Sequence, residues 1–536
     1  MAKKIKAKDI LSLESVLWNC RVALREYGST EKNRDAVIGL VFLKFAGDKF
    51  EQRREEIIQE HYNSPGLIDV LMESQASYGA KNVYYLKETA RWEYIVKNAS
   101  SDEIAVILDA AMKDIEKDNP SLQGALPQNL YANLGAPANK IKSLIDEINK
   151  ISEERFHEED LIGRVYEYFL QVYAASGTKE DGEFYTPASI VRLIAELIEP
   201  YNGIVYDPCC GSGGMFVQSM KFVDRHKGNR NNISIIGQES IAETWKLCKM
   251  NLSIRGIAHD LGETNASTFT NDLFKNRKVD YIMANPPFNL KNWRNENELL
   301  KDPRFHGYTM PPVANANYAW ILHMISKLDV NDGKAGFLLA NGALNADGAE
   351  YEIRKEILER DYVEAIIVLP RDMFYTTDIS VTLWIINMNK KTKVDHGRRL
   401  RNRENNVLFM DLRTWNENIE DIQYEKGKRK RKVAFTDDHI AEIKKVYNSW
   451  QEENSSYKDV PEFCKSVMLD GEGGIRDKDY SLAPSKYIEF IDRDLDIDYE
   501  REMARIQDEM REVLRKEKKS QAMLEEAFKG IGYGLD

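Results

Sequence analysis

Hydrophobic residues follow a helical spacing through the first part of the chain. Leu13, Val16, Leu17, Cys20 and Leu24 recur every three or four residues, and residues 102–117 and 138–151 repeat the pattern. This period places apolar side chains on one face of a helix. We predict a helical N-terminal domain, residues 1–155, that binds a partner or clamps DNA. An inert helical cap is the alternative.

From residue 203 onward the hydrophobic residues gather in short continuous runs, which are typical of strands buried on both faces. Residues 318–328, at helical spacing, lie between two of these runs. This alternation predicts a Rossmann-like α/β sheet with parallel strands, in a catalytic domain of residues 156–415. The predicted strands cover residues 203–206, 233–237, 279–284, 337–339, 363–369 and 381–386.

Before the first predicted strand, the helical hydrophobic pattern is interrupted by a polar loop. Residues 161–172 continue a helical face, and the glycine-containing loop 177–182, which we expect to be mobile, interrupts it. The next helix is predicted to begin with Thr186 as its N-cap and Pro187 as its first residue.

Three polar turns follow successive predicted strands. The first, residues 207–216, contains three glycines and a serine, so a ligand can approach its N–H groups where a helix begins. Glu239, at the tip of the second strand, suits a ribose with two free hydroxyls, and Asp272 in the third turn suits an adenine amine. The glycine turn by itself is equally compatible with a nicotinamide dehydrogenase.

The predicted strand 279–284 ends in a rigid corner, Asn285-Pro286-Pro287-Phe288. The two prolines stop the strand and leave the Pro286 carbonyl pointing outward. An amine conjugated to a ring is a poor nucleophile; if its N–H bonds are drawn to the Asn285 side-chain oxygen and that carbonyl, its lone pair is freed. Phe288 offers a face on which the ring can stack. The alternative is a strand that ends in a proline-stiffened turn.

The net charge of the chain bears on how it could bind DNA. The chain of 536 residues has a net charge of −12, whereas a protein that holds DNA alone usually carries a basic surface. Basic residues cluster only in residues 396–403 and 426–432, each either a solvated loop or a phosphate-contacting loop. We therefore expect a second subunit to supply most of the grip on DNA.

The remaining composition narrows the class of protein. Five cysteines have no metal-ligand spacing, and no apolar run is long enough to cross a bilayer. We expect a protein of the cytoplasm that needs no metal and contacts no membrane.

Residues 416–536 are predicted to form a C-terminal helical region. Tyr499, Met503, Ile506, Met510 and Val513 alternate spacings of four and three on a strongly charged helix, which defines a heptad seam. We expect this helix to dock on a helix of another subunit; packing against its own domain is the alternative.

The order of these motifs resembles that of the gamma-ordered adenine-N6 DNA methyltransferases, and more narrowly the modification subunit of type I restriction-modification systems. The resemblance implies methyl transfer from S-adenosylmethionine to adenine N6, with Asn285 and Pro286 holding the amine, Pro287 completing the corner, and Phe288 stacking on the flipped base. Phe374 is a second stacking candidate, with a buried loop anchor as its alternative. The implied cofactor-binding residues are Glu183, Phe184, Tyr185, Thr186, Pro187, Ala188, Asp207, Gly211, Ser212, Gly213, Gly214, Glu239 and Asp272.

The same resemblance implies the partners: double-stranded DNA, a DNA specificity subunit, a second copy of this chain in an assembly of two modification subunits and one specificity subunit, and a restriction and motor subunit. Rival functions are methylation of an RNA or protein amino group, and a non-catalytic assembly scaffold that keeps a relic cofactor pocket.

Overall fold

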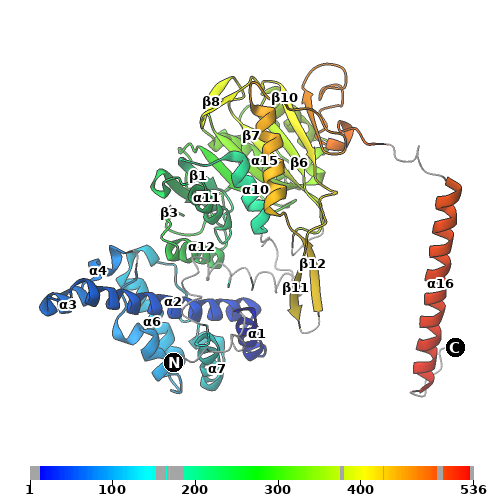
Figure 1. The fold of residues 1–536 in the computed structure, drawn as a ribbon. Coiled ribbons are helices and arrows are strands. Elements are labelled where there is room, and N and C mark those ends of the chain that lie inside the picture. Colours follow the sequence, from blue (N-terminus) through cyan, green and yellow to red (C-terminus); the bar gives the residue numbers. More distant parts are fainter. Residues whose placement is uncertain are drawn as a thin grey trace. The chain divides into compact units, whose positions relative to one another are not determined.

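The computed structural model describes residues 13–81, 83–151, 165, 168, 186–374, 379–425, 428–491 and 499–530 (Figure 1). The chain divides into two compact units. The first comprises Met1–Asp459 with Phe463–Ile488, and the second comprises Val460–Glu462 with Glu489–Asp536. The predicted helix 161–172, apart from residues 165 and 168, and the loop 177–182 lie outside the described residues.

The N-terminal part of the first unit is helical, as predicted, and is drawn in blue to cyan in Figure 1. Its longest helix, α2, is capped by Ser29, whose hydroxyl accepts a hydrogen bond from the Lys32 N–H at 3.3 Å. Apolar faces of these helices share one core that includes Leu17, Phe42 and Leu144. The α-helices are α1 (Leu13–Leu24), α2 (Thr30–Glu60), α3 (Pro65–Met72), α4 (Gln75–Gly79), α5 (Trp92–Lys97), α6 (Ile104–Asp118) and α7 (Ala138–Ile148).

Within the described residues, nine strands form one mixed sheet in the order β13-β10-β6-β7-β5-β4-β1-β2-β3. The run β5-β4-β1-β2-β3 is parallel, and β7 runs antiparallel to both β5 and β6. This arrangement confirms the predicted α/β class. The strands are β1 (Gly203–Asp207), β2 (Ile233–Gly237), β3 (His259–Asp260), β4 (Tyr281–Ala284), β5 (Lys334–Ala340), β6 (Val363–Val368), β7 (Val381–Asn387), β10 (Asn406–Asp411) and β13 (Cys464–Met468).

Both faces of the sheet are covered, which explains why its strands are continuous apolar runs. Alternate strand residues point to opposite faces, so Val205 and Met283 join one core while Tyr206 and Ile282 join the other. With both faces buried, the strand ends remain for ligands. The covering helices are α10 (Ala188–Ile198), α11 (Gly214–Arg225), α12 (Ala242–Ile254), α13 (Asn317–Lys327), α14 (Ala349–Glu359) and α15 (Asp437–Gln451).

The prediction of a helical region from residue 416 onward needs correction. Strands β11 (Ile419–Glu425) and β12 (Lys428–Val433) form a two-stranded sheet, β13 joins the edge of the nine-stranded sheet, and α15 packs into its core. The edge strand was missed because its pairing partner, β10, lies far away in sequence. Only α16 (Tyr499–Gly530), the red helix of Figure 1, belongs to the second unit as a long helix.

The two basic runs prove to have different structures. In residues 396–403, Arg398 pairs with the buried Glu199, and Arg403 is itself fully buried against Glu364. The run is therefore mixed: Leu400 and Arg403 are buried, whereas His396, Gly397, Arg399 and Asn402 are exposed, so only its exposed positions remain open to solvent or to a phosphate. Residues 428–432 of the second run lie in β12, whose register sets acidic positions opposite basic ones: Glu420 faces Lys432, and Asp421 faces Arg431.

None of the described helices is long and apolar enough to span a membrane.

Candidate active site

The glycine turn after β1 makes a cradle at the start of α11. Gly211 and Gly213 have φ of 52° and 84°, a backbone region that favours glycine. A Cβ on Gly213 would approach the Cys248 sulfur to 3.0 Å, whereas positions for a Cβ at Gly211 and Gly214 are open. The turn therefore presents open backbone where a helix begins, which suits a bound ligand.

Hydrogen bonds join this turn to the end of β2. The Gln238 N–H donates to the Asp207 carbonyl at 3.0 Å, and the Cys210 N–H donates to the Gln238 carbonyl at 2.9 Å. The Glu239 carboxylate accepts from the Gly211 N–H at 3.0 Å and from the Ile241 N–H at 2.9 Å. Asp207, the glycine turn and Glu239 are thus brought together, as the sequence predicted.

Two residues that the sequence did not single out hold the third turn, residues 266–274. The fully buried Gln238 side chain donates to the Asn271 carbonyl at 2.7 Å and accepts from the Leu273 N–H at 3.2 Å. The Arg304 guanidinium donates to the carbonyls of Thr268 at 2.7 Å and Phe269 at 2.6 Å. Neither residue has a motif around it, because the backbone groups of the third turn that it binds are distant from it in sequence.

Asp272 is engaged by the protein itself. One carboxylate oxygen lies 2.6 Å from the Lys327 ammonium, and the other accepts from the Phe274 N–H at 3.0 Å. The side chain is buried with its partner, so its evident task is to shape the turn. Contact with an adenine amine would have to use a remaining lone pair, and that role stays a prediction.

The corner after β4 carries a distinctive amide. The Asn285 Nδ2 donates to the Thr186 hydroxyl at 2.8 Å, while Oδ1 is buried and has no hydrogen-bond partner among the described residues. A buried acceptor without a partner is costly unless a ligand satisfies it. The Asn285 backbone also bonds to the Cys209 thiol, which ties the corner to the glycine turn.

Phe288 and Phe374 lie together beside this corner. Their ring centroids are 6.2 Å apart and their planes make an angle of 76°, an edge-to-face contact. Phe288 is half-buried, whereas Phe374 is only 1% exposed. The structure thus brings the two stacking candidates together; the low exposure of Phe374 also suits a loop anchor.

The predicted start of α10 was partly wrong. Pro187 occupies the N-cap position without a side-chain cap, and Ala188 is the first helical residue. Thr186 does not cap the helix because its hydroxyl is engaged by Asn285. Glu183, Phe184 and Tyr185 lie outside the described residues.

Comparison with known proteins now decides the family. A family model described as N-6 DNA Methylase matches residues 157–495, and one described as the HsdM N-terminal domain matches residues 13–148. The chain belongs to the N-6 DNA methylase family. The predicted enzyme class, an adenine-specific DNA methyltransferase that uses S-adenosylmethionine, is therefore confirmed.

Relatives of this N-6 DNA methylase are subunits of type I restriction enzymes. It is 38% identical to the HindI methylase subunit of Haemophilus influenzae over 441 residues, which are 80% of this chain and 93% of the relative. It is 32% identical to the MjaIX methylase subunit of Methanocaldococcus jannaschii, with 97% and 91% covered. The fold matches the type I methyltransferase subunit from Streptococcus thermophilus with a TM-score of 0.70 at 22% identity, covering 89% of this chain and 99% of that one.

The residues of this N-6 DNA methylase fit the cofactor and the amine. The open positions at Gly211 and Gly214 leave room at a helix start, and the partnerless Asn285 Oδ1 is an acceptor of the kind that an amine N–H requires. Among the described residues no group of His, Cys, Asp and Glu is arranged to hold a metal ion.

Two buried carboxyl groups of the methylase site, Asp207 and Glu239, have raised pKa values. Burial raises the pKa of Asp207 to about 7, the Cys209 N–H at 3.0 Å opposes that rise, and the nearby Glu239 charge adds to it. Burial also raises the pKa of Glu239, although backbone N–H groups of Ile241 and Gly211 counteract it. The site therefore holds two carboxyl groups whose ionised forms are disfavoured, and a cation would stabilise those forms.

Replacing Asp207 by asparagine is expected to stabilise the ligand-free methylase more at pH 8 than at pH 5. The folded-state pKa of about 7 lies above the ordinary value of 3.8, so this group makes the folded protein less stable as pH rises from about 4 to 7. Roughly two of these three pKa units fall between pH 5 and pH 8, which corresponds to a difference of about 3 kcal/mol. Thermal unfolding of both proteins at the two pH values measures the difference, with the exposed Asp260→Asn as control. An equal effect at both pH values would contradict it.

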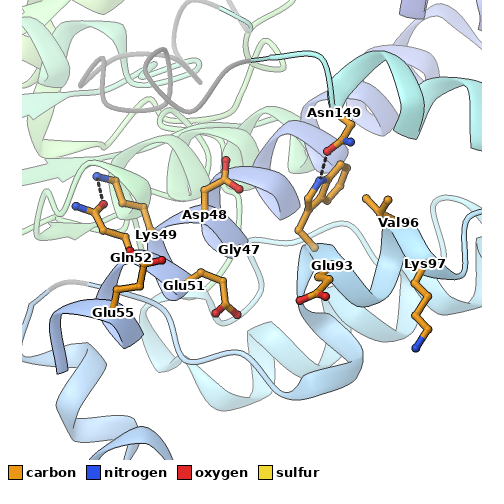
Figure 2. Close-up of a pocket in the computed structure, with 11 residues that line it drawn as sticks. Gly47, Asp48, Lys49, Glu51, Gln52, Glu55, Glu93, Val96, Lys97 and Asn149 are labelled. Carbon is orange, nitrogen blue, oxygen red and sulfur yellow. Dashed lines mark hydrogen bonds between the residues drawn. The ribbon is translucent and has the colours of Figure 1, made fainter. Parts of the chain in front are cut away.

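A cavity of about 760 Å³ lies elsewhere, in the N-terminal helical domain (Figure 2). Acidic side chains of α2, such as Asp48 and Glu51, line it together with Trp92, whose indole N–H donates to the Asn149 side-chain oxygen at 2.9 Å. None of the residues that line this cavity belongs to the Asn285–Phe288 corner or to the glycine turn. The cavity is therefore separate from the methylase site.

Proposed function

We propose that Asn285 and Pro286 accept the two N–H bonds of an adenine amine and so prepare its nitrogen for methyl transfer. The observation that carries this proposal is the buried Asn285 Oδ1, which has no hydrogen-bond partner among the described residues. Acceptors that draw both N–H bonds toward them make the amine nitrogen tetrahedral, which takes its lone pair out of conjugation with the ring and frees it to attack. S-adenosylmethionine, when bound, supplies a methyl group on a sulfonium, which is already a good electrophile.

The chain's own residues then act mainly by positioning. Target adenine must leave the duplex to reach such a corner, and Phe288 offers a face for stacking, with Phe374 at its edge. The glycine turn and Glu239 are proposed to hold the methionine and ribose parts of the cofactor. The predicted roles of residues 183–188, Asp207 and Asp272 in cofactor binding remain part of this proposal, except that of Thr186, whose hydroxyl is engaged by Asn285.

We propose domain boundaries that differ from those predicted from the sequence at the C-terminal end of the catalytic domain. Residues 1–155 would form the helical domain, and the catalytic domain would extend beyond residue 415 because α15 and β13 complete its sheet. The docking element is then α16 alone. Its seam residues Tyr499, Met510 and Val513 are 74%, 62% and 62% exposed.

We propose that the chain acts as the modification subunit of a type I restriction-modification complex in the cytoplasm. It would bind double-stranded DNA together with a specificity subunit, a second copy of itself, and a restriction and motor subunit. Support comes from the HindI and MjaIX methylase subunits and from a solved structure of an assembled type I system, which matches this fold with a TM-score of 0.55 at 18% identity.

Charged substitutions in the α16 seam are expected to abolish assembly without affecting cofactor binding. Met510→Asp with Val513→Asp would place carboxylates where a partner helix needs apolar contact. Co-purification of the co-expressed specificity subunit measures assembly, and calorimetry measures S-adenosylmethionine binding. Glu512→Gln with Glu509→Gln on the same helix is the control and should leave assembly intact. Retained assembly in the seam variant would show that α16 is not the docking element.

The proposed function is tested by transfer of labelled methyl to genomic DNA, with the chain alone and with its co-expressed specificity subunit. Digestion and mass spectrometry identify the modified base. N6-methyladenine that appears only with the partner supports the modification-subunit assignment. Activity without a partner would overturn the dependence on it. Methyl on RNA or protein, or cofactor binding with no transfer to any acceptor, would favour the amino-group methyltransferase or scaffold alternatives.

A further inference from the structure

The Asn285 side chain has two chemically opposite ends. Its Oδ1 only accepts hydrogen bonds and its Nδ2 only donates them. The amide turns about a torsion with broad, roughly two-fold preferences, so asparagine alone does not choose which end faces a ligand. Because an adenine amine donates both of its hydrogens, only the orientation with Oδ1 toward the amine can activate it.

A neighbour must therefore select the orientation, and Thr186 lies where such a neighbour is needed. Its hydroxyl accepts from Nδ2 at 2.8 Å, and this is the one hydrogen bond of the Asn285 side chain among the described residues. The bond joins positions 99 residues apart, from the segment before α10 to the end of β4. With Nδ2 engaged, Oδ1 is left buried and without a protein partner.

Thr186 is itself held firmly. It is half-buried, its β-branched side chain has few rotamers, and the following Pro187 restricts its backbone to extended conformations. Pro187 is the N-cap of α10, a helix whose residues Ile190 and Ile194 are fully buried in the core of the sheet. The acceptor therefore lies next to the N-cap of a helix that is anchored in the core of the sheet.

We propose that Thr186 is a positioning residue that locks the Asn285 amide with its oxygen toward the target amine. The inference rests on the proposed function, and it gives Thr186 a task in amine activation in place of a contact with the methionine part of the cofactor. Loss of the lock lets the amide turn, so that its NH₂ group faces the NH₂ group of adenine in part of the molecules.

The lock predicts a specific kinetic pattern. Thr186→Val keeps the shape and removes the acceptor, so we expect kcat to fall by about 10- to 100-fold, the effect of losing one well-placed buried hydrogen bond. The KM for DNA and the Kd for S-adenosylmethionine should change little, because neither depends on which end of the amide faces the amine. Thr186→Ser keeps an acceptor and should restore most of the rate.

The experiment measures kcat, KM and cofactor Kd for the assembled complex with wild type, Thr186→Val, Thr186→Ala and Thr186→Ser. Ser189→Ala is the matched control: it removes a buried hydroxyl three residues further along, which has no hydrogen-bond partner among the described residues. Thermal unfolding of each variant checks that it folds, and alanine serves in place of valine if valine does not fold.

Wild-type kcat in both the valine and alanine variants would overturn the inference. A weakened cofactor Kd with unchanged kcat would also overturn it, and would return Thr186 to the cofactor site. Failure of serine to restore activity would mean that the methyl group, not the acceptor, matters. Absence of methyl transfer by the wild-type complex would instead overturn the proposed function, and the inference with it.

Discussion

Replacing Asn285 by alanine will lower the rate of methyl transfer by about 100- to 1,000-fold, the range found when one preorganised group at a reacting centre is removed. The alanine variant keeps the Pro286 carbonyl but loses the Asn285 Oδ1, the side-chain acceptor proposed for the amine. One N–H bond of the adenine amine then has no acceptor, and its nitrogen remains conjugated to the ring. Single-turnover transfer of labelled methyl by the assembled complex measures the loss.

Cofactor affinity separates this effect from damage to the site. The Asn285 backbone bonds to the Cys209 thiol of the glycine turn, and alanine preserves that contact. The Kd for S-adenosylmethionine should therefore stay close to the wild-type value. Asn202→Ala, an exposed asparagine before β1, is the matched control and should retain full activity. Undiminished transfer by the Asn285 variant would place the chemistry elsewhere.

Replacing Arg403 by methionine will destabilise the fold by about 3–5 kcal/mol, because it leaves a buried charge without its partner. Arg403 and Glu364 are both fully buried, and the guanidinium donates to the carboxylate at 2.9 Å. Burial alone would raise the pKa of Glu364. The positive charge of Arg403, with a hydrogen bond from Asn387 at 2.8 Å, overcomes burial and lowers that pKa to about 2.

The direction of the pH dependence follows from the lowered pKa. Glu364 stabilises the fold above its ordinary pKa of 4.5, and this contribution is lost as pH falls toward 2. Urea unfolding at pH 7 measures the Arg403→Met effect. Glu364→Gln combined with Arg403→Met should recover much of the loss, since glutamine removes the charge but keeps hydrogen-bonding capacity. Arg399→Met, at a 75% exposed position of the same basic run, should cost almost nothing.

This buried pair matters for the site because Glu364 links strand β6 to Arg403 and to helix α15. Glu364 lies on β6 and also accepts from the Tyr447 hydroxyl of α15 at 2.9 Å. Strand β6 leads directly into the segment that carries Phe374. If the double variant were no more stable than Arg403→Met, the loss would come from packing of the arginine stem and not from the charge left behind.

The strands of the catalytic sheet and the turns at their ends could be predicted from the sequence alone. A strand covered on both faces has to be a continuous apolar run, and a turn that receives a ligand needs glycine or proline where the chain changes direction. Both requirements are local, so β1, β2 and the end of β4 lie where the pattern predicted. The placement of Glu239 beside the glycine turn followed from the parallel order of those strands.

The partners of the polar side chains, in contrast, became known from the three-dimensional fold. Thr186 was predicted to cap a helix but bonds to Asn285, and Asp272 is occupied by Lys327. Arg403, within a run that was expected at the surface, is buried on Glu364. The reason is the same in each case: a buried polar group must find a partner of matching character, and that partner can lie anywhere in the sequence that the fold brings within hydrogen-bond distance.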